Sequence, residues 1–334
     1  MTPMLCRAAI GATFLFAPPL LADGFDIVVL GATGGIQSGN LSAFMIHPSD
    51  DPRAVTCDAG SIVNGLIEAE AQGSLDHLSV PDASDYTRVG HAYTEVIKGY
   101  AINHAHLDHV AGLIIGSPDD GPKKIYSLPS VLRDIQTTYF NWTAWPNFGT
   151  TGTAPQLGKY DYVPLVPGRS VEVVDTGMRV TAHPLAHGPV EAAAFVYESG
   201  DAALLCFGDT GPDSVEGGER MADIWRAVAD RAASGTLKAV IIESSYTSDR
   251  PDDLLFGHLT PRYVLEGLDM LARLAGGQGS LAGLPVIISH VKYSLLKGPS
   301  PQERILAELE AGNTQGVRFI MPVQGARYEL GDWK

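Results

Sequence analysis

The segment 103–109 constrains the fold of this chain more than any other, because it reads NHAHLDH and directly follows the apolar run Gly99–Ile102. Three imidazoles and one carboxylate lie within six residues, and unpaired imidazoles so close together would titrate near neutrality and repel one another. A divalent cation removes that conflict. Since the apolar run predicts a strand, the segment predicts a metal site at a strand end.

The order of these side chains divides them into two sets. We expect His104 and His106 to project the same way from an extended turn, so that both meet one ion. Asp108 and His109 then turn toward a second ion as a helix begins. Imidazole and carboxylate donors together suit zinc, manganese or iron, and a ligand set without thiolates is typical of a catalytic, open site.

Two ions need more than these four ligands, and three further candidates stand at predicted strand ends. His187 lies in PLAHG, Asp209 lies in CFGDTG, and His290 closes the run PVIISH. A single strand-end histidine is more often structural. Together, the three have the residue types and the positions that a metal site requires.

The rest of the chain alternates short apolar runs, glycine-rich turns and helical stretches, which predicts an α/β fold with two sheets and helices outside them. Strands are expected at 25–30, 41–47, 54–57, 99–102, 171–174, 179–183, 192–197, 203–207, 239–243, 285–289 and 318–321. Helices are expected at 61–72, 107–115, 129–139, 219–233, 261–275 and 301–311, three of them with a proline near the start. No linker divides residues 23–334, so we expect one domain there, with an insertion or lid loop over Asn141–Pro167.

Composition limits the partners. The 334 residues carry a formal charge of −15, and binding to a nucleic-acid backbone depends on Lys and Arg, so nucleic acid is not an expected partner. Three cysteines cannot form a disulfide framework or a four-thiolate zinc site. We expect no membrane partner, and the oligomeric state, a homodimer included, is left open.

Residues 1–22 predict a cleaved export signal. Arg7 is followed by the apolar run Ala8–Ala17, which is too short to span a membrane, and Ala22 is a small residue at the expected cleavage point. An exported protein follows, periplasmic in a Gram-negative bacterium.

The turn Gly31-Ala-Thr-Gly34-Gly35 imitates a dinucleotide-binding motif, because it follows a predicted strand and precedes acidic residues. That motif must lead into a helix, whereas Leu41–His47 is strand-like. A tight turn between two strands is the better interpretation.

The seven candidates resemble the ligand motif of the metallo-β-lactamase superfamily, His-x-His-x-Asp-His followed by a distant His, Asp and His. The resemblance implies a four-layer αβ/βα sandwich with a site for two divalent ions, zinc foremost, along one edge. It assigns His104, His106 and His187 to one ion, and Asp108, His109 and His290 to the other. Asp209 would bridge the two ions.

Flanking motifs narrow the resemblance to the class II 3′,5′-cyclic-nucleotide phosphodiesterases, which include exported bacterial cyclic-AMP phosphodiesterases. These motifs are GG and GNLS after residue 33, DAG from Asp58, GDTGPD around Asp209, ESSY from Glu243, GHLTP around His258 and SHVK around His290. A transfer-RNA 3′-processing endonuclease has a comparable Glu and Gly-His-Ser/Thr pair, but the acidic charge and the export signal disfavour it. A non-catalytic binding protein on the same fold is the other alternative, although such proteins usually lose ligands.

The resemblance implies hydrolysis of a cyclic nucleotide, cyclic AMP first, to a nucleoside 5′-monophosphate. A hydroxide held between two ions about 3.5–4 Å apart would attack phosphorus. His258 would protonate the leaving O3′, with Glu243 on its other ring nitrogen. The expected catalytic residues are therefore His258 and Glu243, together with Asp108 among the ligands.

The remaining candidates have less specific interpretations. His47, His77 and His91 are expected at the surface or in loops, and His183 at an ordinary strand position. Cys57 and Cys206 are expected to be buried thiols, although export would permit a bond between them. Lys292 either meets the phosphate or is solvated, and the aromatic residues Trp142, Trp145, Phe148 and Tyr160 either stack on the base or anchor their loop.

Overall fold

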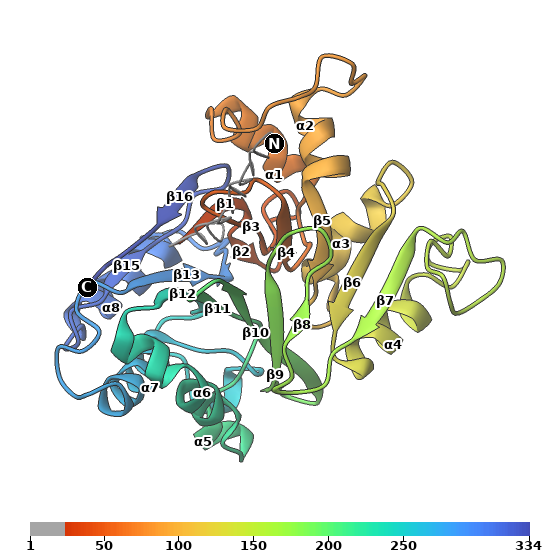
Figure 1. The fold of residues 1–334 in the computed structure, drawn as a ribbon. Coiled ribbons are helices and arrows are strands. Elements are labelled where there is room, and N and C mark those ends of the chain that lie inside the picture. The colour runs from red at the N-terminus through yellow and green to blue at the C-terminus, as the bar shows by residue number, and fades with distance from the viewer. Residues whose placement is uncertain (1–23) are drawn as a thin grey trace, which may run out of the picture.

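Two seven-stranded sheets form the centre of the computed structural model, which describes residues 24–334 (Figure 1). The predicted export signal lies outside the described residues. The first sheet has the order β16-β1-β3-β4-β5-β6-β7, and its strands are Phe25–Gly31 (β1), Ala43–Pro48 (β3), Ala54–Cys57 (β4), Ile97–Ala101 (β5), Lys123–Ser127 (β6), Tyr160–Pro164 (β7) and Arg327–Leu330 (β16).

The second sheet has the order β15-β13-β12-β11-β10-β9-β8. Its strands are Val171–Glu172 (β8), Arg179–His187 (β9), Val190–Ser199 (β10), Ala202–Phe207 (β11), Leu237–Glu243 (β12), Pro285–Ser289 (β13) and Arg318–Ile320 (β15). A short parallel pair, Thr33–Gly34 (β2) and Val291–Lys292 (β14), joins the two halves of the chain. Strands β4 to β7 are parallel, as are β11, β12, β13 and β15.

Helices cover the outer face of each sheet. Their bounds are Val63–Ala71 (α1), Arg88–His91 (α2), Leu107–Gly116 (α3), Pro129–Thr138 (α4), Asp213–Glu216 (α5), Arg220–Ser234 (α6), Pro261–Leu274 (α7) and Pro301–Ala311 (α8), with a π-helical turn Ala92–Val96 (η1) and a 3₁₀ turn Asp252–Leu254 (η2). Figure 1 shows α6 and α7 on the side of the second sheet that faces away from the first. This is the four-layer sandwich that the sequence predicted.

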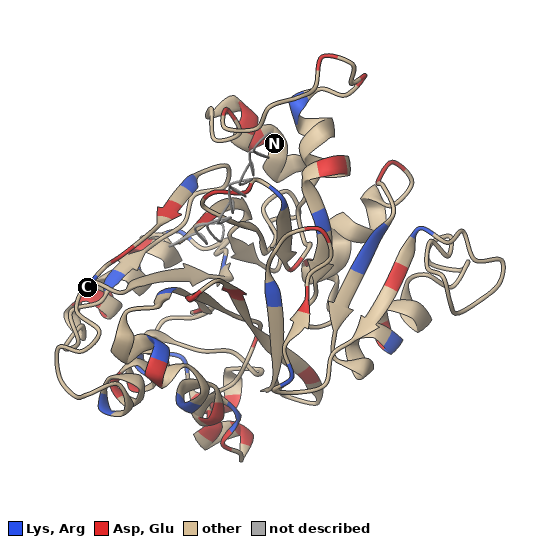
Figure 2. Ribbon diagram, viewed as in Figure 1, with Lys and Arg blue, Asp and Glu red and all other residues tan. Residues whose placement is uncertain are grey.

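The sequence explains why the outer helices form and which face they bury. Helices α4, α7 and α8 each have a proline in the first turn, where no intrahelical partner is lost. Ser300 and Glu303 form a capping box at the start of α8. Helix α6 buries Ile224, Trp225 and Val228, whereas acidic and basic side chains alternate on its exposed face (Figure 2).

A disulfide links the two sheets across the core. Cys57 ends β4 in the first sheet and Cys206 lies in β11 of the second, and a disulfide joins them across 149 residues of sequence. Of the two alternatives, the bond that export would permit is the one present, and the expectation of two free thiols was wrong. It failed because residues so far apart in sequence become neighbours only when the two sheets pack together.

The segment 141–167 differs from the predicted lid. Its last part forms β7, which pairs with β6 at the edge of the first sheet. Tyr160 is fully buried and Phe148 is nearly so, and Trp145 packs against the same core, so these three anchor the segment. Only Trp142 of the four aromatic residues is exposed.

Among the described residues, no helix combines the length and the apolar character needed to cross a membrane.

Candidate metal centre and active site

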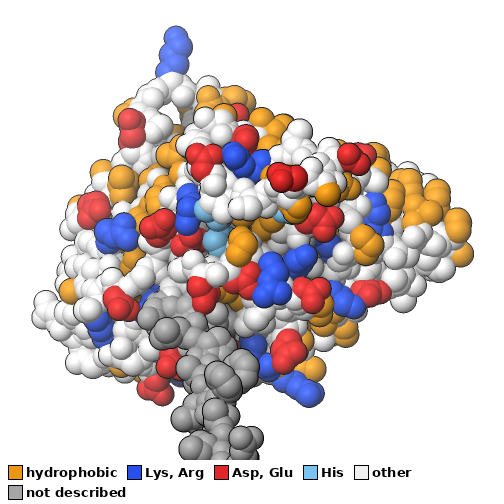
Figure 3. Space-filling view, turned by 45° about the horizontal axis from the view of Figure 1, so that its top comes forward, with side chains coloured by type: hydrophobic (Ala, Val, Ile, Leu, Met, Phe, Trp, Pro, Cys, Tyr) orange, Lys and Arg blue, Asp and Glu red, His pale blue; other side chains and the backbone are white. Residues whose placement is uncertain are grey.

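All seven predicted ligands converge at one edge of the sandwich, where strands of both sheets end. His104, His106, Asp108 and His109 follow β5, whereas His187 ends β9, Asp209 follows β11 and His290 directly follows β13. In α/β sheets this carboxyl edge is the usual place for a ligand. Figure 3 shows histidine side chains in a hollow near the middle of one face, with Lys and Arg side chains on both sides of it.

The ligand atoms lie close enough to share ions. Within each of three groups, all ligand atoms lie within 4.8 Å of one another: His104 with His106 and His187, His104 with His109 and Asp209, and Asp108 with His109 and His290. The Oδ2 atom of Asp209 lies 3.2 Å from His109 Nε2 and 3.3 Å from His290 Nε2, and it lies 3.9 Å from both His104 Nε2 and His187 Nε2. Asp209 therefore lies between the two sets of ligands predicted for the two ions.

His104 shows that these residues fit a metal. It is fully buried, and neither of its ring nitrogens has a hydrogen-bond partner among residues 24–334. Burial, together with the neighbouring His109, lowers the pKa of His104 well below its usual value, so the ring is neutral and offers a free lone pair. Buried polar atoms in native proteins are rarely left unsatisfied, and a cation satisfies this one.

Asp58 fixes the orientation of the His109 ring through a hydrogen bond to Nδ1. It follows β4 and accepts a hydrogen bond of 2.6 Å from His109 Nδ1, which leaves Nε2 directed at Asp209 and His290. The backbone and side-chain amides of Asn103 both donate to Asp58 at 2.8 Å. A carboxylate that fixes the tautomer of a ligating histidine is a common feature of metal sites.

Hydrogen bonds fix two further ligands in the same way. His187 Nδ1 donates to the Gly257 carbonyl at 2.7 Å. His290 Nδ1 donates to Ser245 Oγ at 3.0 Å, and Ser245 in turn donates to Glu243 at 2.6 Å. In both histidines the Nε2 lone pair is left for the centre of the site.

The glycine turn near the N-terminus forms one wall of the site. No dinucleotide-type helix follows it, since the chain continues through β2 into β3. A Cβ atom on Gly34 would lie 2.3 Å from the His290 ring, and the Gly35 amide donates to Asp108 at 2.9 Å. Glycine is needed here because the backbone lies directly against a ligand.

Glu243 and His258 form a buried pair beside the ligands. His258 Nδ1 lies 3.1 Å from Glu243 Oε1 and 3.7 Å from Asp209 Oδ2. The backbone amides of Thr210 and Leu259 also donate to Glu243. Burial opposes the charged form of His258, but Glu243 and Asp209 outweigh it and raise the pKa of His258 above its usual value. The pair is built to hold a proton on the imidazole.

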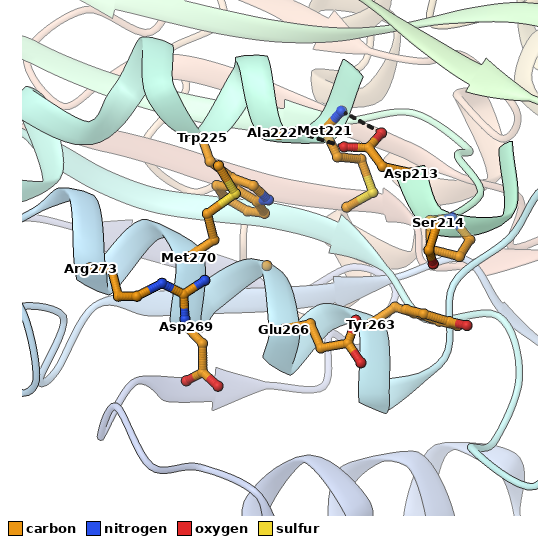
Figure 4. A pocket seen from close by; sticks show the side chains of 12 residues that line it. Asp213, Ser214, Met221, Ala222, Trp225, Tyr263, Glu266, Asp269, Met270 and Arg273 are labelled. Atoms are coloured by element: carbon orange, nitrogen blue, oxygen red, sulfur yellow. Dashed lines mark hydrogen bonds between the residues drawn. The ribbon is translucent and has the colours of Figure 1, made fainter. Parts of the chain in front are cut away.

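The loop that carries Asp209 is attached to the outer helical layer. Both carboxylate oxygens of Asp213 accept hydrogen bonds from the first turn of α6, from Met221 N at 3.0 Å and Ala222 N at 2.9 Å. Figure 4 shows this contact at the rim of a pocket of about 400 Å³ between α6 and α7. An acidic residue at a helix N-terminus is favourable, so this contact stabilises the loop.

The other histidines fall partly outside the expectations. His47 is buried in β3, so the expectation of a surface or loop position was wrong for this residue, whereas His77 lies in a turn as expected. The two rings stack with their centroids 5.1 Å apart. The sequence gave no indication of this pair, because its members come from separate elements. His183 occupies an ordinary position in β9, as expected.

Three residues with evident supporting roles at the site were not assigned in advance: Asp58, Asn103 and Ser245. Asp58 could have been found, because it lies in a DAG motif directly after a predicted strand, like the ligands themselves. Ser245 likewise lies in the ESSY motif, two residues after a predicted strand, but no role was assigned to it.

Fold and site together define a metallo-β-lactamase-fold protein. Solved structures that the chain resembles include unliganded yeast PDE1, with a TM-score of 0.78 and 25% identity over 92% of this chain and 99% of that one. The metallo-β-lactamase fold protein YhfI from Bacillus subtilis, at 15% identity and a TM-score of 0.59 over 92% of this chain and 99% of that one, shares the fold.

The chain belongs to the class-II cAMP phosphodiesterases, which match residues 25–325. It is 48% identical to a 3′,5′-cyclic-nucleotide phosphodiesterase of Aliivibrio fischeri over 91% of this chain and 92% of that one. It is 37% identical to a probable 3′,5′-cyclic-nucleotide phosphodiesterase of Yersinia pestis, over 96% of this chain and 94% of that one. The family predicted from the sequence motifs is thereby confirmed.

Proposed function

We propose that this enzyme hydrolyses 3′,5′-cyclic nucleotides, cyclic AMP foremost, to nucleoside 5′-monophosphates. The observation that carries the proposal is the buried Glu243–His258 pair, 3.7 Å from Asp209 at the centre of the seven predicted ligands. Membership in the class-II family supports the choice of substrate. A small anion is also compatible with a chain of charge −15, which is ill suited to a nucleic-acid partner.

The proposed site would hold two divalent ions, with zinc preferred. His104, His106 and His187 would hold one ion and Asp108, His109 and His290 the other, with Asp209 shared between the two sets. When bound, such ions neutralise charge on phosphoryl oxygens and lower the pKa of water. The all-nitrogen-and-oxygen ligand set and the unsatisfied His104 support this assignment.

His258 has the task of protonating the leaving group. Hydrolysis adds water to phosphorus and breaks the P–O3′ bond, which leaves an alkoxide on the ribose. His258 delivers a proton to O3′ from Nε2, while Glu243 holds Nδ1 and balances the charge of the protonated ring. Three hydrogen bonds hold Glu243 in place, from Thr210, Leu259 and Ser245.

Replacing His258 with Ala tests the proton transfer. Turnover of cyclic AMP should fall by about 10²–10⁴-fold, which is typical for loss of general acid catalysis. Turnover of an activated aryl phosphodiester should fall much less, because its leaving group needs no proton. Equal losses on both substrates would contradict the acid role, and absence of cyclic-AMP hydrolysis by the metal-loaded wild type would contradict the function itself.

We further propose that residues 23–334 form one catalytic domain that is exported after cleavage near Ala22. The disulfide between Cys57 and Cys206 supports export, because such bonds persist in oxidising compartments. Ligands contributed by both sheets to one site support a single domain. Fractionation of a Gram-negative host and N-terminal sequencing test this: a cytoplasmic protein beginning at Met1 would refute it.

A further inference from the structure

A groove of about 690 Å³ opens beside the candidate active site. It is lined mainly by the segments 245–254 and 292–304, and Ile36 from the glycine turn completes it. Pockets for small ligands usually have about 300–1,000 Å³, so the groove is large enough for a nucleoside. None of the seven predicted ligands lines it, so the groove is separate from the metal centre.

The groove is nevertheless continuous with the centre. Ser245 lines it, and the Oγ atom of the same residue hydrogen-bonds His290 and Glu243. Lys292 lines it as well, and its side chain passes Gly35, whose amide donates to Asp108. A molecule whose phosphate lies at the ligands therefore extends naturally into this space.

The charge of the groove is opposite to that of the chain. Its basic residues are Arg250, Lys292, Lys297 and Arg304, and the only acidic residue that lines it is Asp249, which pairs with Arg304 at 3.1 Å. Lys292 forms no ion pair among the described residues. A locally basic groove in an acidic protein concentrates a small anion at that place.

The walls also offer surface for a flat, partly apolar group. Leu295 and Leu296 are 83% and 85% exposed, which is unusual for two adjacent leucines unless something covers them. Tyr246 packs edge-on against His258 with the ring centroids 5.8 Å apart, and the Arg250 guanidinium lies 4.3 Å from the Tyr246 ring. Aromatic and guanidinium planes are the surfaces on which nucleobases stack.

We propose that this groove binds the nucleoside part of the substrate, with the base between the Tyr246–Arg250 pair and the apolar side chains of 293–296. Lys292 then lies on the phosphate side. The proposal rests on the proposed function and adds the residues that select a nucleotide over a simple phosphodiester. It makes Leu295 and Leu296 specificity determinants, although neither contacts a predicted ligand.

The test compares two substrates, cyclic AMP and an aryl phosphodiester that lacks a nucleoside. In metal-loaded enzyme, the double variant Leu295→Asp/Leu296→Asp should raise KM for cyclic AMP at least about tenfold, because covering a large aliphatic side chain is worth about that factor and a carboxylate offers the base no apolar surface. Its kcat for cyclic AMP and its kinetics on the simple diester should stay within about twofold of wild type.

Leu157→Asp is the matched control, since Leu157 is half-exposed in the distant segment 141–167. It should leave both substrates unaffected, and unchanged melting temperatures of all variants show that they fold. An unchanged KM for cyclic AMP, or equal losses on both substrates, would overturn the assignment of the groove. Wild-type enzyme that cleaves the simple diester but no cyclic nucleotide would instead overturn the proposed function.

Discussion

His109, His187 and His290 at the carboxyl edge of the strands are buried, and of the pair His47–His77 the first ring is buried and the second half-buried, yet the two groups have different hydrogen-bond partners. At the edge, each of His109, His187 and His290 has one nitrogen tied to an outer acceptor and the other directed at Asp209 or a second imidazole. In the pair, three of the four ring nitrogens have no hydrogen-bond partner among the described residues. Asp26, which lies opposite His47 in the sheet, instead accepts a hydrogen bond from Arg327 and forms an ion pair with it.

The difference shows what makes a metal site. Buried imidazoles alone do not suffice. His47 has an outer acceptor in the Pro48 carbonyl, but among residues 24–334 no carboxylate converges with the two rings on a common point. The edge has both, since strand ends from two sheets place unlike side chains around one point.

The largest expected effect comes from removing the carboxylate at the centre. Asp209→Ala should reduce bound metal and lower turnover by at least about a thousandfold, because charge stabilisation by metal is worth several kcal/mol. Metal analysis and initial rates measure this. His47→Gln is the matched control and should retain metal and kcat; loss of metal in that variant would erase the contrast between the two histidine groups.

The disulfide should be the next largest contributor, here to stability. Cys57→Ala/Cys206→Ala, or reduction of the wild type, should lower the free energy of unfolding by about 2–5 kcal/mol, because the bond closes a long loop in the unfolded chain. Denaturant unfolding with and without reductant measures this loss. The double variant serves as control, since reductant should have no effect on it; equal stability of the oxidised and reduced wild type would contradict the prediction.

A smaller effect is expected from the outer acceptor of His109. Asp58→Asn should lower metal affinity or turnover about 10–100-fold, as is typical for such supporting groups. Asn also tolerates the left-handed backbone of this residue, with φ of +59°, so the fold should be kept. Metal titration checks this, with Asp26→Asn beside the histidine pair as control. Equal metal loss in both variants would show that the effect is not local.

The smallest effect concerns pH and the histidine pair. Burial, with Arg327 and His47 nearby, lowers the pKa of His77 to about 4, and burial also lowers the pKa of His47. Between pH 4 and about 6.5 the unfolded chain binds more protons than the folded one, so stability falls as the pH falls through this window. His77→Gln should flatten the dependence of the unfolding midpoint on pH; an unchanged slope would contradict the shift.

The sequence predicted most of the strands and helices that carry the site, because their apolar runs are long and end in glycine or proline. It missed β6, which begins with two lysines, and the edge strands β7 and β16, whose partly exposed side chains give no clear apolar period. The candidate ligands were predicted from their spacing and their place at strand ends, and the structure brings them together. The role of Ser245 was not assigned, and the Cys57–Cys206 bond was left open, since only the folded chain shows that these residues lie beside their partners.

The division of the ligands between the sheets has a consequence for how the protein is assembled. The first half of the chain contributes His104 to His109, and the second half contributes His187, Asp209 and His290, so neither half alone can hold an ion as the whole does. A metal ion bound by these residues would therefore link two halves that are distant in sequence, and a chelator would remove that link.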